Sequence, residues 1–527
     1  MNDADGMLQP ADEPHTIGRW LTDRAAATPA AIAIDDRGVR ITYGALAERA
    51  GALTESLRDA GYRPGDRVAT VSGNSIDHVV AFFACAQTGL AFIPLSWRLT
   101  AGELAPIIDR AAPHLLLIED EHAALAGDAR DRMCAPAPVA LLGGTGVETH
   151  VPTRTDRLGA AADRQHVRDD DVALVIFTSG SEGSPKGVKL THANCFWNNL
   201  ALSGVLQLTA HDVVLAMLPQ FHVASWNVQP LLAWWTGATV VLERSFQPER
   251  VLQLIAERRV TAMMGVPTQY RLLADDARFA AADLSSLRIA QVGGALMAAD
   301  LFQAWADRGV ELLQGYGLTE ASPNTLSVAP GAGAAAIGTV GRPYPHVEVQ
   351  LADTETGLAL TGAATGELWV RGPSVFAGYL DDEAATARAM AGEWLRTGDL
   401  VQRTADGDYR VIDRLKDIYI SGGENIAPAE VERALGAHPL VAAAAVVAVP
   451  DRVWGERGVA FVELTEGARC GEDELLAHAR AHLASFKVPM RVVVVDELPR
   501  SAIDKLARSR LRDRARELVA EVTHESE

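Results

Sequence analysis

One short stretch of the chain concentrates the groups that bind a polyphosphate. Between Thr178 and Gly187, three glycines, four hydroxyl side chains and one lysine follow the apolar segment VALVIF. Glycine lets backbone N–H groups converge on an anion, the hydroxyls add donors, and Lys186 supplies positive charge. A Gly/Ser hairpin without a ligand is the alternative interpretation of this composition. The predicted phosphate-binding residues are Thr178, Ser179, Gly180, Ser181, Gly183 and Lys186.

The residues after its lysine distinguish this loop from a Walker A sequence. A Walker A loop requires Gly-Lys followed by Ser or Thr and then a helix. Here Lys186 is followed by Gly187 and the strand-like segment VKL. The residue types therefore fit a triphosphate, but the loop is not a Walker A loop.

Three further segments offer groups suited to other parts of a nucleotide. Glu320 after Thr319 provides a carboxylate and a hydroxyl, the hard oxygen ligands that Mg²⁺ prefers, although such a pair alone is more often a surface feature. Gly293 and Gly294 follow the strand-like RIAQV, and ligands approach parallel sheets at the carboxyl ends of their strands. Asp399 in RTGDL can accept hydrogen bonds from both hydroxyls of a ribose; otherwise it is a turn or cap carboxylate.

The pattern of apolar residues predicts two α/β layers that position these groups. From about residue 41 to 95, the strand-like segments ITY, RVATVS and AFIPL alternate with two helical stretches. Similar alternation recurs from about residue 212 to 307. Strands that alternate with helices predict mostly parallel sheets. The first helix carries its apolar residues on one face: Leu46, Ala50, Leu53 and Leu57.

The pattern of turn residues and apolar segments changes over the last two hundred residues. Gly-rich and Pro-rich turns separate short strands between about residues 330 and 413, which predicts a small β-rich region. From about residue 417, strands and helices alternate again and end in a basic helix near 504–516, which predicts an independent α+β domain. The segment DRLKD (413–417) is the candidate linker.

Charge and composition exclude several classes of protein. The 527 residues include 48 basic and 68 acidic ones, and the net charge of −20 argues against nucleic acid or an anionic membrane as the main partner. Four distant cysteines in no CxxC pair argue against a disulfide framework or a structural zinc site. No apolar run reaches the roughly 18 residues of a membrane span, and the acidic segment MNDADGMLQPADEPH lacks the features of a signal peptide. We expect a cytoplasmic protein.

The order of the motifs resembles that of the adenylate-forming superfamily, which includes acyl-CoA synthetases, adenylation domains of peptide synthetases and luciferases. The segment 176–188 resembles the family's phosphate loop, and GYGLTE (315–320) resembles its adenine and magnesium segment. RTGD (396–399) is similar to the ribose-binding segment and RLKD (414–417) to the hinge. SGGENI (421–426) is similar to the loop that reaches the active site for the second half-reaction.

The resemblance implies an α/β fold with two domains. A large N-terminal domain, residues 1–415, would combine two α/β layered subdomains with a small β-rich region and hold the ATP and acyl sites. A small mobile α+β domain, residues 416–527, would follow it. This division agrees with the candidate linker at 413–417.

The resemblance also implies roles for individual residues. Glu320 and Thr178 would hold Mg²⁺, Tyr316 would stack on adenine, Asp399 would bind the ribose, and Lys416 would be the hinge pivot. The implied catalytic residues are Lys505, Thr178, Glu320 and His222. Beyond the phosphate loop, the implied nucleotide-binding residues are Gly293, Gly294, Ala295, Gln314, Gly315, Tyr316, Gly317, Thr319, Asp399, Arg414, Lys416, Gly422 and Gly423.

Two places depart from the family pattern. Lys505 aligns with the lysine that meets the substrate carboxylate and the α-phosphate, but Asp504 and Ile503 replace the usual glycine and threonine before it. A carboxylate beside this lysine stabilises its charged form and partly offsets its attraction to phosphate. Glu182 stands where threonine is common and adds negative charge to the phosphate loop.

The segment around His222 bears on the choice of acid. A lone histidine there is more often a core residue, whereas the resemblance implies one that lines the acyl site and moves with the acyl group. Adenylation domains for amino acids carry an aspartate soon after the position of Phe221, and none follows here. Acetyl-CoA synthetases carry a tryptophan where Gly317 stands, so we expect a pocket for a longer acid. Four residues line this pocket or belong to the core: Trp226, Val266, Pro267 and Tyr270.

The predicted function is that of an AMP-forming ligase with ATP, Mg²⁺ and CoA as the implied cofactors and co-substrates. A medium-chain, cyclic or aryl carboxylic acid would react with ATP to give an acyl-adenylate and then an acyl-CoA. The alternative is transfer of the acyl group to an amino acid or amine, without CoA, as in coronafacate-type ligases. The resemblance leaves open whether the chain forms a homodimer.

Overall fold

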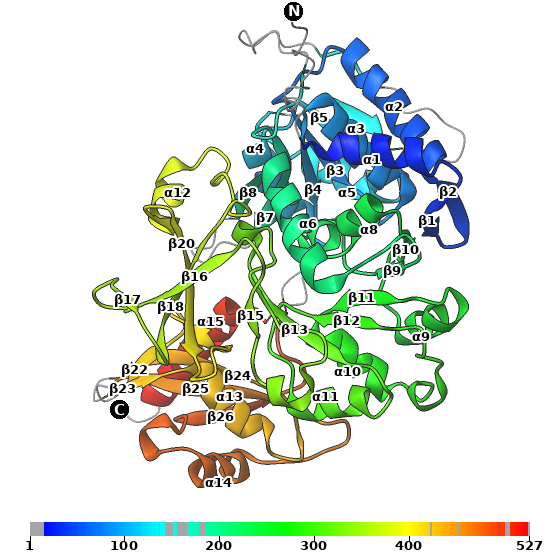
Figure 1. Ribbon diagram of the computed structural model, residues 1–527. Helices are drawn as coiled ribbons and strands as arrows, with labels where there is room; N and C mark the ends of the chain where they lie inside the picture. The colour runs from blue at the N-terminus through cyan, green and yellow to red at the C-terminus, as the bar shows by residue number, and fades with distance from the viewer. Residues whose placement is uncertain are drawn as a thin grey trace, which may run out of the picture. The chain divides into compact units, whose positions relative to one another are not determined.

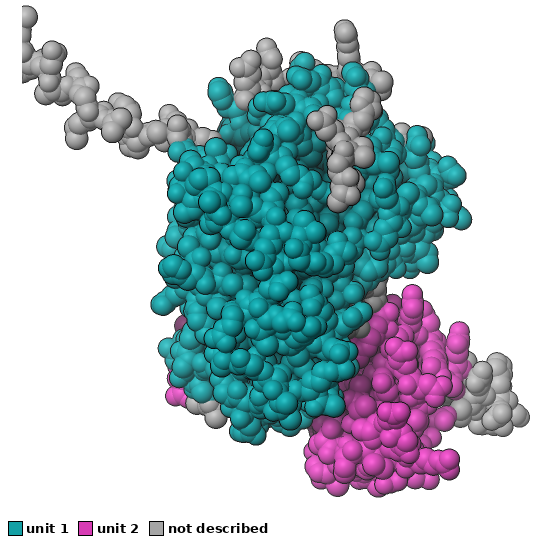
Figure 2. Space-filling view, turned by 90° about the vertical axis from the view of Figure 1, so that its right-hand side faces the viewer, with its two compact units in different colours: residues 1–349, 370–395 teal, residues 350–369, 396–527 magenta. Residues whose placement is uncertain are grey.

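The computed structural model describes residues 15–135, 137–142, 151–154, 166–178, 185–421, 424–451, 454–500 and 506–524 (Figure 1). The chain divides into two compact units (Figure 2). The first unit consists of residues 1–349 and 370–395, and the second of residues 350–369 and 396–527. The domain boundary between residues 415 and 416 stays a prediction.

Six strands form the first α/β sheet of the first unit, in the order β6-β5-β3-β4-β7-β8. All neighbours pair in parallel except β7 and β8, which form an antiparallel hairpin. Helices α4 and α5 pack on one face of this sheet through a core of aliphatic residues. The strands are β3 (Arg67–Val71), β4 (Ala91–Leu95), β5 (Leu115–Ile118), β6 (Val139–Leu141), β7 (Val172–Thr178) and β8 (Lys186–Thr191).

Nine strands form the second α/β sheet, in the order β15-β14-β13-β12-β11-β9-β10-β1-β2. Its six central strands are parallel, and antiparallel strands close both edges. Helices α9, α10 and α11 cover one face. The strands are β1 (Ile32–Asp36), β2 (Val39–Thr42), β9 (Val213–Ala216), β10 (Thr239–Leu242), β11 (Ala262–Gly265), β12 (Ile289–Val292), β13 (Leu312–Tyr316), β14 (Leu326–Ser327) and β15 (Arg342–Pro343).

Helix α3 is buried between these two sheets, which explains its almost uniformly apolar sequence. Phe82 packs edge-on against Phe92 of β4, and Phe83 packs edge-on against Trp234 of α8. The Trp234 indole in turn donates a hydrogen bond to the carbonyl of Ala33 in β1. A helix with apolar contacts on every side does not show the polar face of a surface helix.

The first unit contains helices α1 to α12, and several of them begin at a side-chain cap. The hydroxyls of Thr42 and Ser75 accept backbone hydrogen bonds at the starts of α2 and α3, as N-cap residues do. These helices are α1 (Ile17–Ala27), α2 (Tyr43–Asp59), α3 (Ile76–Thr88), α4 (Ala101–Ala111), α5 (Ala123–Arg130), α6 (His192–Leu206), α7 (Ala224–Asn227), α8 (Pro230–Thr236), α9 (Pro248–Glu257), α10 (Pro267–Asp275), α11 (Ala299–Ala306) and α12 (Glu383–Ala389).

The predicted β-rich region forms a third sheet. Its order is β17-β16-β18-β20-β19, and β21 pairs with β20 in an antiparallel register. The strands are β16 (Glu348–Ala352), β17 (Ala359–Leu360), β18 (Ala364–Arg371), β19 (Met390–Ala391), β20 (Trp394–Arg403) and β21 (Tyr409–Arg414).

The C-terminal part of the chain forms a three-layer α+β structure within the second unit. The alternating burial of β24 explains it: Val446 faces the core under α13 and α14, whereas Ala445 and Val447 face the core under α15. Strand β26 pairs with β25 in parallel. The elements are β22 (Tyr419–Ser421), β23 (Glu424–Ile426), α13 (Pro428–Gly436), β24 (Val441–Asp451), β25 (Gly455–Leu464), α14 (Glu472–His482), β26 (Arg491–Val495) and α15 (Arg508–His524).

The predicted fold class is confirmed, with local differences at element boundaries. Tyr43 begins a helix instead of ending a strand, because Thr42 before it is the helix cap. The predicted basic helix near 504–516 begins at Arg508 and continues to His524. The predicted linker is shortened, since Asp413 and Arg414 end strand β21. Across the described residues, every helix is too short or too polar to cross a lipid bilayer.

Candidate active site

The two ends of the predicted phosphate loop lie side by side. Thr178 is the last residue of β7 and Lys186 the first of β8, and they are partners in the antiparallel register. The Thr178 hydroxyl donates a hydrogen bond of 3.4 Å to the Lys186 carbonyl. Five residues of the loop that sequence singled out, Ser179, Gly180, Ser181, Glu182 and Gly183, lie outside the described residues.

Tyr379 connects the lysine of this loop to the predicted magnesium ligand. Its hydroxyl donates a hydrogen bond of 2.8 Å to Oε1 of Glu320. The ammonium of Lys186 lies 5.4 Å from the centroid of its ring, within the range of a cation–π contact. The structure therefore brings Thr178, Lys186 and Glu320 to one place, around a tyrosine that sequence reasoning missed.

Buried amide side chains hold the segment that carries Glu320. Ser322 has a left-handed backbone conformation with φ of 71°, and its carbonyl accepts a hydrogen bond of 3.0 Å from Nδ2 of Asn227. Its hydroxyl donates to the carbonyl of Ser374. Nδ2 of Asn324 donates to Oδ1 of Asn198 over 2.9 Å. Such buried, paired amides fix the irregular backbone that follows the 3₁₀ turn of Thr319–Ala321.

The residues at this place fit a magnesium ion by their chemistry. Glu320 is half-buried, and among the described residues only Tyr379 donates a hydrogen bond to its carboxylate, at Oε1. The Thr178 hydroxyl is also half-buried, at the end of its strand. Carboxylate and hydroxyl oxygens beside a phosphate loop are the donor set that Mg²⁺ uses with nucleotides.

The predicted adenine-binding residues lie on or after two neighbouring parallel strands. Gly293, Gly294 and Ala295 follow β12, and Gln314 is the middle residue of β13, which ends at Tyr316. Nε2 of Gln314 donates to the carbonyl of Ala295 over 3.1 Å, and its Oε1 accepts from the backbone N–H of Met297 over 3.1 Å. The Gln314 side chain thus holds the backbone of the loop that follows Gly293 and Gly294.

Close packing against the Pro323 carbonyl requires glycine at position 317. A Cβ atom at this position would lie 1.4 Å from the carbonyl oxygen of Pro323, so no side chain fits this backbone. Thr319 and half-buried Tyr316 flank it, and the Tyr316 carbonyl accepts from the N–H of Thr325. The absence of tryptophan at Gly317 therefore carries less information on acid length than the sequence suggested.

The candidate acyl-pocket residues separate into two groups. Trp226 is fully buried, stacks on Phe82 with a centroid distance of 4.4 Å and bonds the Gln220 carbonyl, so it belongs to the core. Tyr270 is also fully buried, and its hydroxyl bonds the carbonyl of Gln291.

His222 and the start of α10 keep partial exposure. His222 is half-buried with its ring against Phe221, at a centroid distance of 4.5 Å. Val266 and Pro267 at the start of α10 are half-buried as well. These three residues, in contrast to Trp226 and Tyr270, stay candidates for the acyl site.

In the second unit, the predicted ribose-binding residues form an ion pair. Asp399 and Arg414 are register partners on β20 and β21, and Nε of Arg414 lies 2.6 Å from Oδ1 of Asp399. The carboxylate of Asp399 is nearly fully buried, whereas Arg414 is half-exposed. The guanidinium holds the carboxylate in place at the surface of the sheet.

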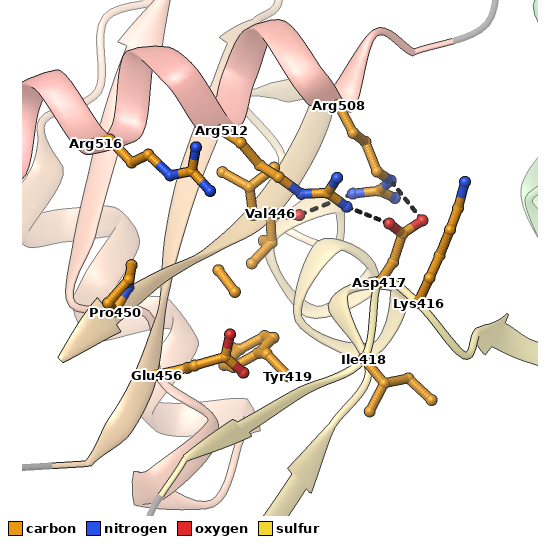
Figure 3. A pocket seen from close by; sticks show the side chains of 12 residues that line it. Lys416, Asp417, Ile418, Tyr419, Val446, Pro450, Glu456, Arg508, Arg512 and Arg516 are labelled. Atoms are coloured by element: carbon orange, nitrogen blue, oxygen red, sulfur yellow. Dashed lines mark hydrogen bonds and ion pairs between the residues drawn. The ribbon is translucent and has the colours of Figure 1, made fainter. Parts of the chain in front are cut away.

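The predicted hinge is anchored on its C-terminal side (Figure 3). Asp417 forms ion pairs with Arg512 and Arg508 of α15, and Arg508 also bonds the Glu432 carboxylate. Burial lowers the pKa of Lys416, which lies beside a pocket of about 260 Å³ lined by these arginines. Leu415 follows strand β21 and donates to the carbonyl of Gly398 over 2.8 Å, so Lys416 lies between two residues that are each held in place, Leu415 and Asp417.

Several predicted residues lie outside the described part of the chain. Gly422 and Gly423 of the SGGENI segment are among them. So are the catalytic candidate Lys505 and its unusual neighbours Asp504 and Ile503. Their roles stay predictions.

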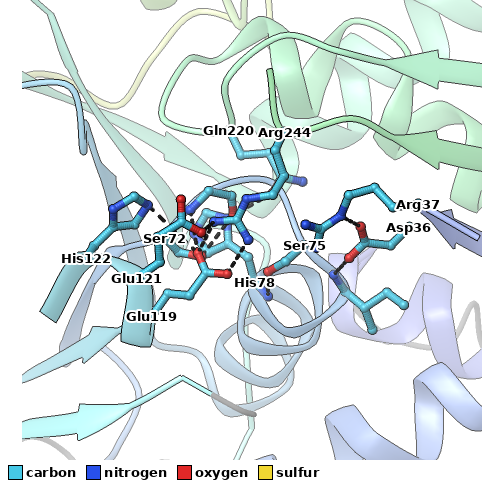
Figure 4. A network of polar contacts seen from close by, with 12 residues as sticks. Asp36, Arg37, Ser72, Ser75, His78, Glu119, Glu121, His122, Gln220 and Arg244 are labelled. Atoms are coloured by element: carbon cyan, nitrogen blue, oxygen red, sulfur yellow. Dashed lines mark hydrogen bonds and ion pairs between the residues drawn. The ribbon is translucent and has the colours of Figure 1, made fainter. Parts of the chain in front are cut away.

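A second polar network, which sequence reasoning also missed, joins the two α/β sheets (Figure 4). Arg244 after β10 binds Glu119 after β5 through two hydrogen bonds, and Glu119 also accepts from the N–H of Gly73 after β3. Burial acts to raise the pKa of Glu119, but Arg244 and Gly73 outweigh it and lower this pKa. A Cβ at Gly73 would lie 2.6 Å from Nη2 of Arg244, so a side chain at this position would displace the guanidinium from its present place.

His78 is the core histidine beside this network. Nδ1 donates to Oε1 of Gln220 over 2.9 Å, and Nε2 accepts from the Thr70 hydroxyl over 2.8 Å. The ring is fully buried, and burial lowers its pKa to about 4. Both nitrogens of the neutral ring are thus satisfied in the folded protein.

We expect His78 to make the protein less stable in mild acid. The unfolded chain takes up a proton near the ordinary pKa of 6.5, whereas the folded protein resists it down to about 4. Stability is therefore full above pH 6.5 and falls as the pH decreases toward 4, by about 2 kcal/mol between pH 7 and 5. Urea unfolding at both pH values should show this loss reduced in His78→Gln. The exposed His211→Gln serves as the control, and an equal pH dependence in wild type and His78→Gln contradicts the assignment.

Comparisons with known proteins agree with this arrangement of motifs. The chain matches the AMP-binding enzyme family over residues 21–380 and the AMP-binding enzyme C-terminal domain over residues 430–505. A feruloyl-CoA synthase from an Amycolatopsis species is 40% identical over 501 residues, which cover 94% of this chain and 99% of that protein. An indoleacetate–CoA ligase from Aromatoleum aromaticum is 34% identical, covering 96% and 99%. The structure of an amide bond synthetase from Marinactinospora thermotolerans superposes with a TM-score of 0.83 at 31% identity, covering 94% and 98%.

Proposed function

The chain belongs to the family of AMP-binding enzymes, and on that premise we propose that it is an AMP-forming acid–CoA ligase. One observation carries this proposal: 40% identity over nearly the full length of both chains to a feruloyl-CoA synthase. The proposed substrates are a carboxylic acid, ATP and CoA, and the products are an acyl-CoA, AMP and pyrophosphate. We place the reaction in the cytoplasm, where ATP and CoA are supplied.

We propose an aryl acid as the substrate. The names of the relatives support this choice, because ferulate and indoleacetate are both aromatic carboxylates. The chain itself offers no aspartate after Phe221 to pair with the ammonium group of an amino acid. His222, Val266 and Pro267 are the half-buried residues proposed to contact the acyl group.

The first half-reaction joins the acid to the α-phosphate of ATP. The carboxylate oxygen attacks the α-phosphorus, and pyrophosphate leaves as the acyl-adenylate forms. Lys186 and the phosphate loop bind the triphosphate, and Lys505 holds the attacking carboxylate and α-phosphate together. Positive charge at fixed positions stabilises the transition state more than it stabilises the substrate. Mg²⁺, held by Glu320 and Thr178, would supply further charge neutralisation.

The second half-reaction transfers the acyl group from the adenylate to the thiol of CoA. We propose that rotation of the chain at Lys416 removes Lys505 and brings Gly422 and Gly423 to the acyl-adenylate. The fixed position of Asp417, which pairs with Arg512 and Arg508 of α15, supports a pivot at this residue. Asp399 and Arg414 would bind the ribose, and Tyr316 the adenine.

An amide ligase is the second candidate function. The structural match to an amide bond synthetase favours it, as does the replacement of the residues before Lys505 by Ile503 and Asp504. In that reaction an amine, and not a thiol, attacks the acyl-adenylate.

The acceptor decides between the two functions. Pyrophosphate and AMP release should be measured with ferulate, indoleacetate, cyclic and fatty acids, each alone, with CoA, and with an amino acid mixture. We expect an aryl acid to release pyrophosphate, and CoA to stimulate AMP turnover with formation of a thioester detected by mass spectrometry. Stimulation by amines alone would establish the amide ligase instead. No pyrophosphate release with any acid would contradict both.

A further inference from the structure

Tyr379 makes two different contacts through two different parts of its side chain. The phenol hydroxyl donates a hydrogen bond of 2.8 Å to Oε1 of Glu320. The face of the ring lies under the ammonium of Lys186, 5.4 Å from the centroid. The first contact depends on the hydroxyl alone and the second on the ring alone, so the two can be separated by substitution.

The backbone around Tyr379 is held beside the phosphate loop. Residues 377–380 run along β8: Lys189 donates to the carbonyl of Gly378, and the N–H of Leu380 donates to the carbonyl of Gly187. Tyr379 itself forms an antiparallel bridge with Val188. The segment thus behaves as a short extra strand on the edge of β8, and it fixes the tyrosine to the strand that begins with Lys186.

A second set of contacts fixes the segment to Glu320. The N–H of Phe376 donates to the carbonyl of Glu320 over 2.8 Å, and the ring of Phe376 packs edge-on against Tyr379 at 5.0 Å. The N–H of Tyr379 donates to the Thr386 hydroxyl over 2.9 Å. The tyrosine therefore has a defined position relative to both the backbone and the carboxylate of Glu320.

We propose that Tyr379 is a positioning residue that sets the carboxylate of Glu320 and the ammonium of Lys186 relative to each other for binding of MgATP. This inference rests on the proposed function of the site. The phenol donor stabilises the ionised carboxylate and occupies Oε1, so that the carboxylate presents itself to the metal in one orientation. The ring favours a charged lysine directed across its face.

The two contacts predict different effects for two substitutions. Tyr379→Phe keeps the ring under Lys186 and removes the donor to Glu320, so the Mg²⁺ concentration for half-maximal pyrophosphate release should rise about 10-fold. The KM for ATP at saturating Mg²⁺ should change less than about 3-fold. Tyr379→Leu removes both contacts and should raise the KM for ATP by about 3- to 10-fold in addition.

A binding measurement separates this inference from the proposed reaction. Calorimetric titration of the full chain with ATP, at low and at high Mg²⁺, reports the same dependence without turnover. If the wild type binds MgATP but releases no pyrophosphate with any acid, the proposed function fails, and the effect of Tyr379→Phe on Mg²⁺-dependent ATP binding still tests the positioning role.

The controls distinguish positioning from a general loss of structure. Tyr62→Phe removes another hydroxyl of the first unit, which bonds the carbonyl of Pro152, and should leave the Mg²⁺ dependence unchanged. In the background of Glu320→Gln, Tyr379→Phe should have little further effect on Mg²⁺ dependence, because the charged metal ligand that Tyr379 orients has already been removed. A wild-type Mg²⁺ dependence of Tyr379→Phe, or an equal shift in Tyr62→Phe, overturns the proposal. If Tyr379→Leu fails to fold, Tyr379→Phe alone decides.

Discussion

Replacing Glu320 by glutamine is expected to slow pyrophosphate release by about 10²- to 10³-fold, the range for loss of one group that stabilises a developing anion, because the Mg²⁺ that Glu320 is proposed to hold would be bound less well. Glutamine has nearly the same volume, and its carbonyl still accepts the hydrogen bond from Tyr379. The backbone of Glu320 keeps its hydrogen bond from Phe376. The substitution thus removes a negative charge from the proposed magnesium site and little else.

The dependence on magnesium distinguishes this loss from a folding defect. The rate of Glu320→Gln should recover partly as Mg²⁺ is raised, while its thermal unfolding midpoint stays close to that of the wild type. Glu249→Gln, at an exposed carboxylate paired with Arg278, is the matched control and should retain full activity. A variant with the wild-type rate and Mg²⁺ dependence would show that Glu320 is not a ligand.

The α/β architecture was predictable because strand and helix periods alternate so regularly in the first three hundred residues. Leu46, Ala50, Leu53 and Leu57 all prove to be buried on α2. Local boundaries were harder, since they depend on capping: Tyr43 continues the apolar pattern of a strand but follows a threonine cap. Helix α3 shows a further limit, because burial between two sheets removes the polar face that periodicity detects.

The site was predictable where the chain itself places the residues together. Thr178 and Lys186 are close because a hairpin joins them, and Glu320 was recognised from the YGLTE segment. Tyr379 was missed because it is distant in sequence from both of its partners, Lys186 and Glu320. Glu119 and Arg244 were missed for the same reason, since only the meeting of two sheets brings their strand ends together.

Histidines show how burial decides a question that residue type leaves open. Residue type alone favoured a core position for His222, whereas the resemblance placed it at the acyl site. His222 is half-buried, and His78 is the enclosed histidine with both ring nitrogens bonded. His78 lies in an apolar helix, and the residues next to it in the sequence do not predict its hydrogen bonds with Thr70 and Gln220. A gating role for His222 stays a prediction that its partial exposure allows.

Replacing Asp399 by asparagine is expected to raise the KM for ATP by about 10- to 100-fold, because each hydrogen bond to a charged group contributes about 1.5–3 kcal/mol. Asp399 is nearly fully buried and lies 2.6 Å from Nε of Arg414. Asparagine keeps one acceptor oxygen but places an amide donor where the carboxylate accepted. The KM for the carboxylic acid should change little, since Asp399 is proposed to contact only the ribose.

Deoxy analogues of ATP test this assignment directly. If the carboxylate of Asp399 accepts from the ribose hydroxyls, the wild type should use 2′-deoxy-ATP and 3′-deoxy-ATP less well than ATP. Asp399→Asn should lose most of that discrimination, because the partner of the missing hydroxyl has been removed as well. A purely structural role through Arg414 predicts instead that the variant is weakened equally toward all three nucleotides. Asp353→Asn, at an exposed turn carboxylate of the same unit, should leave the KM values for all three unchanged.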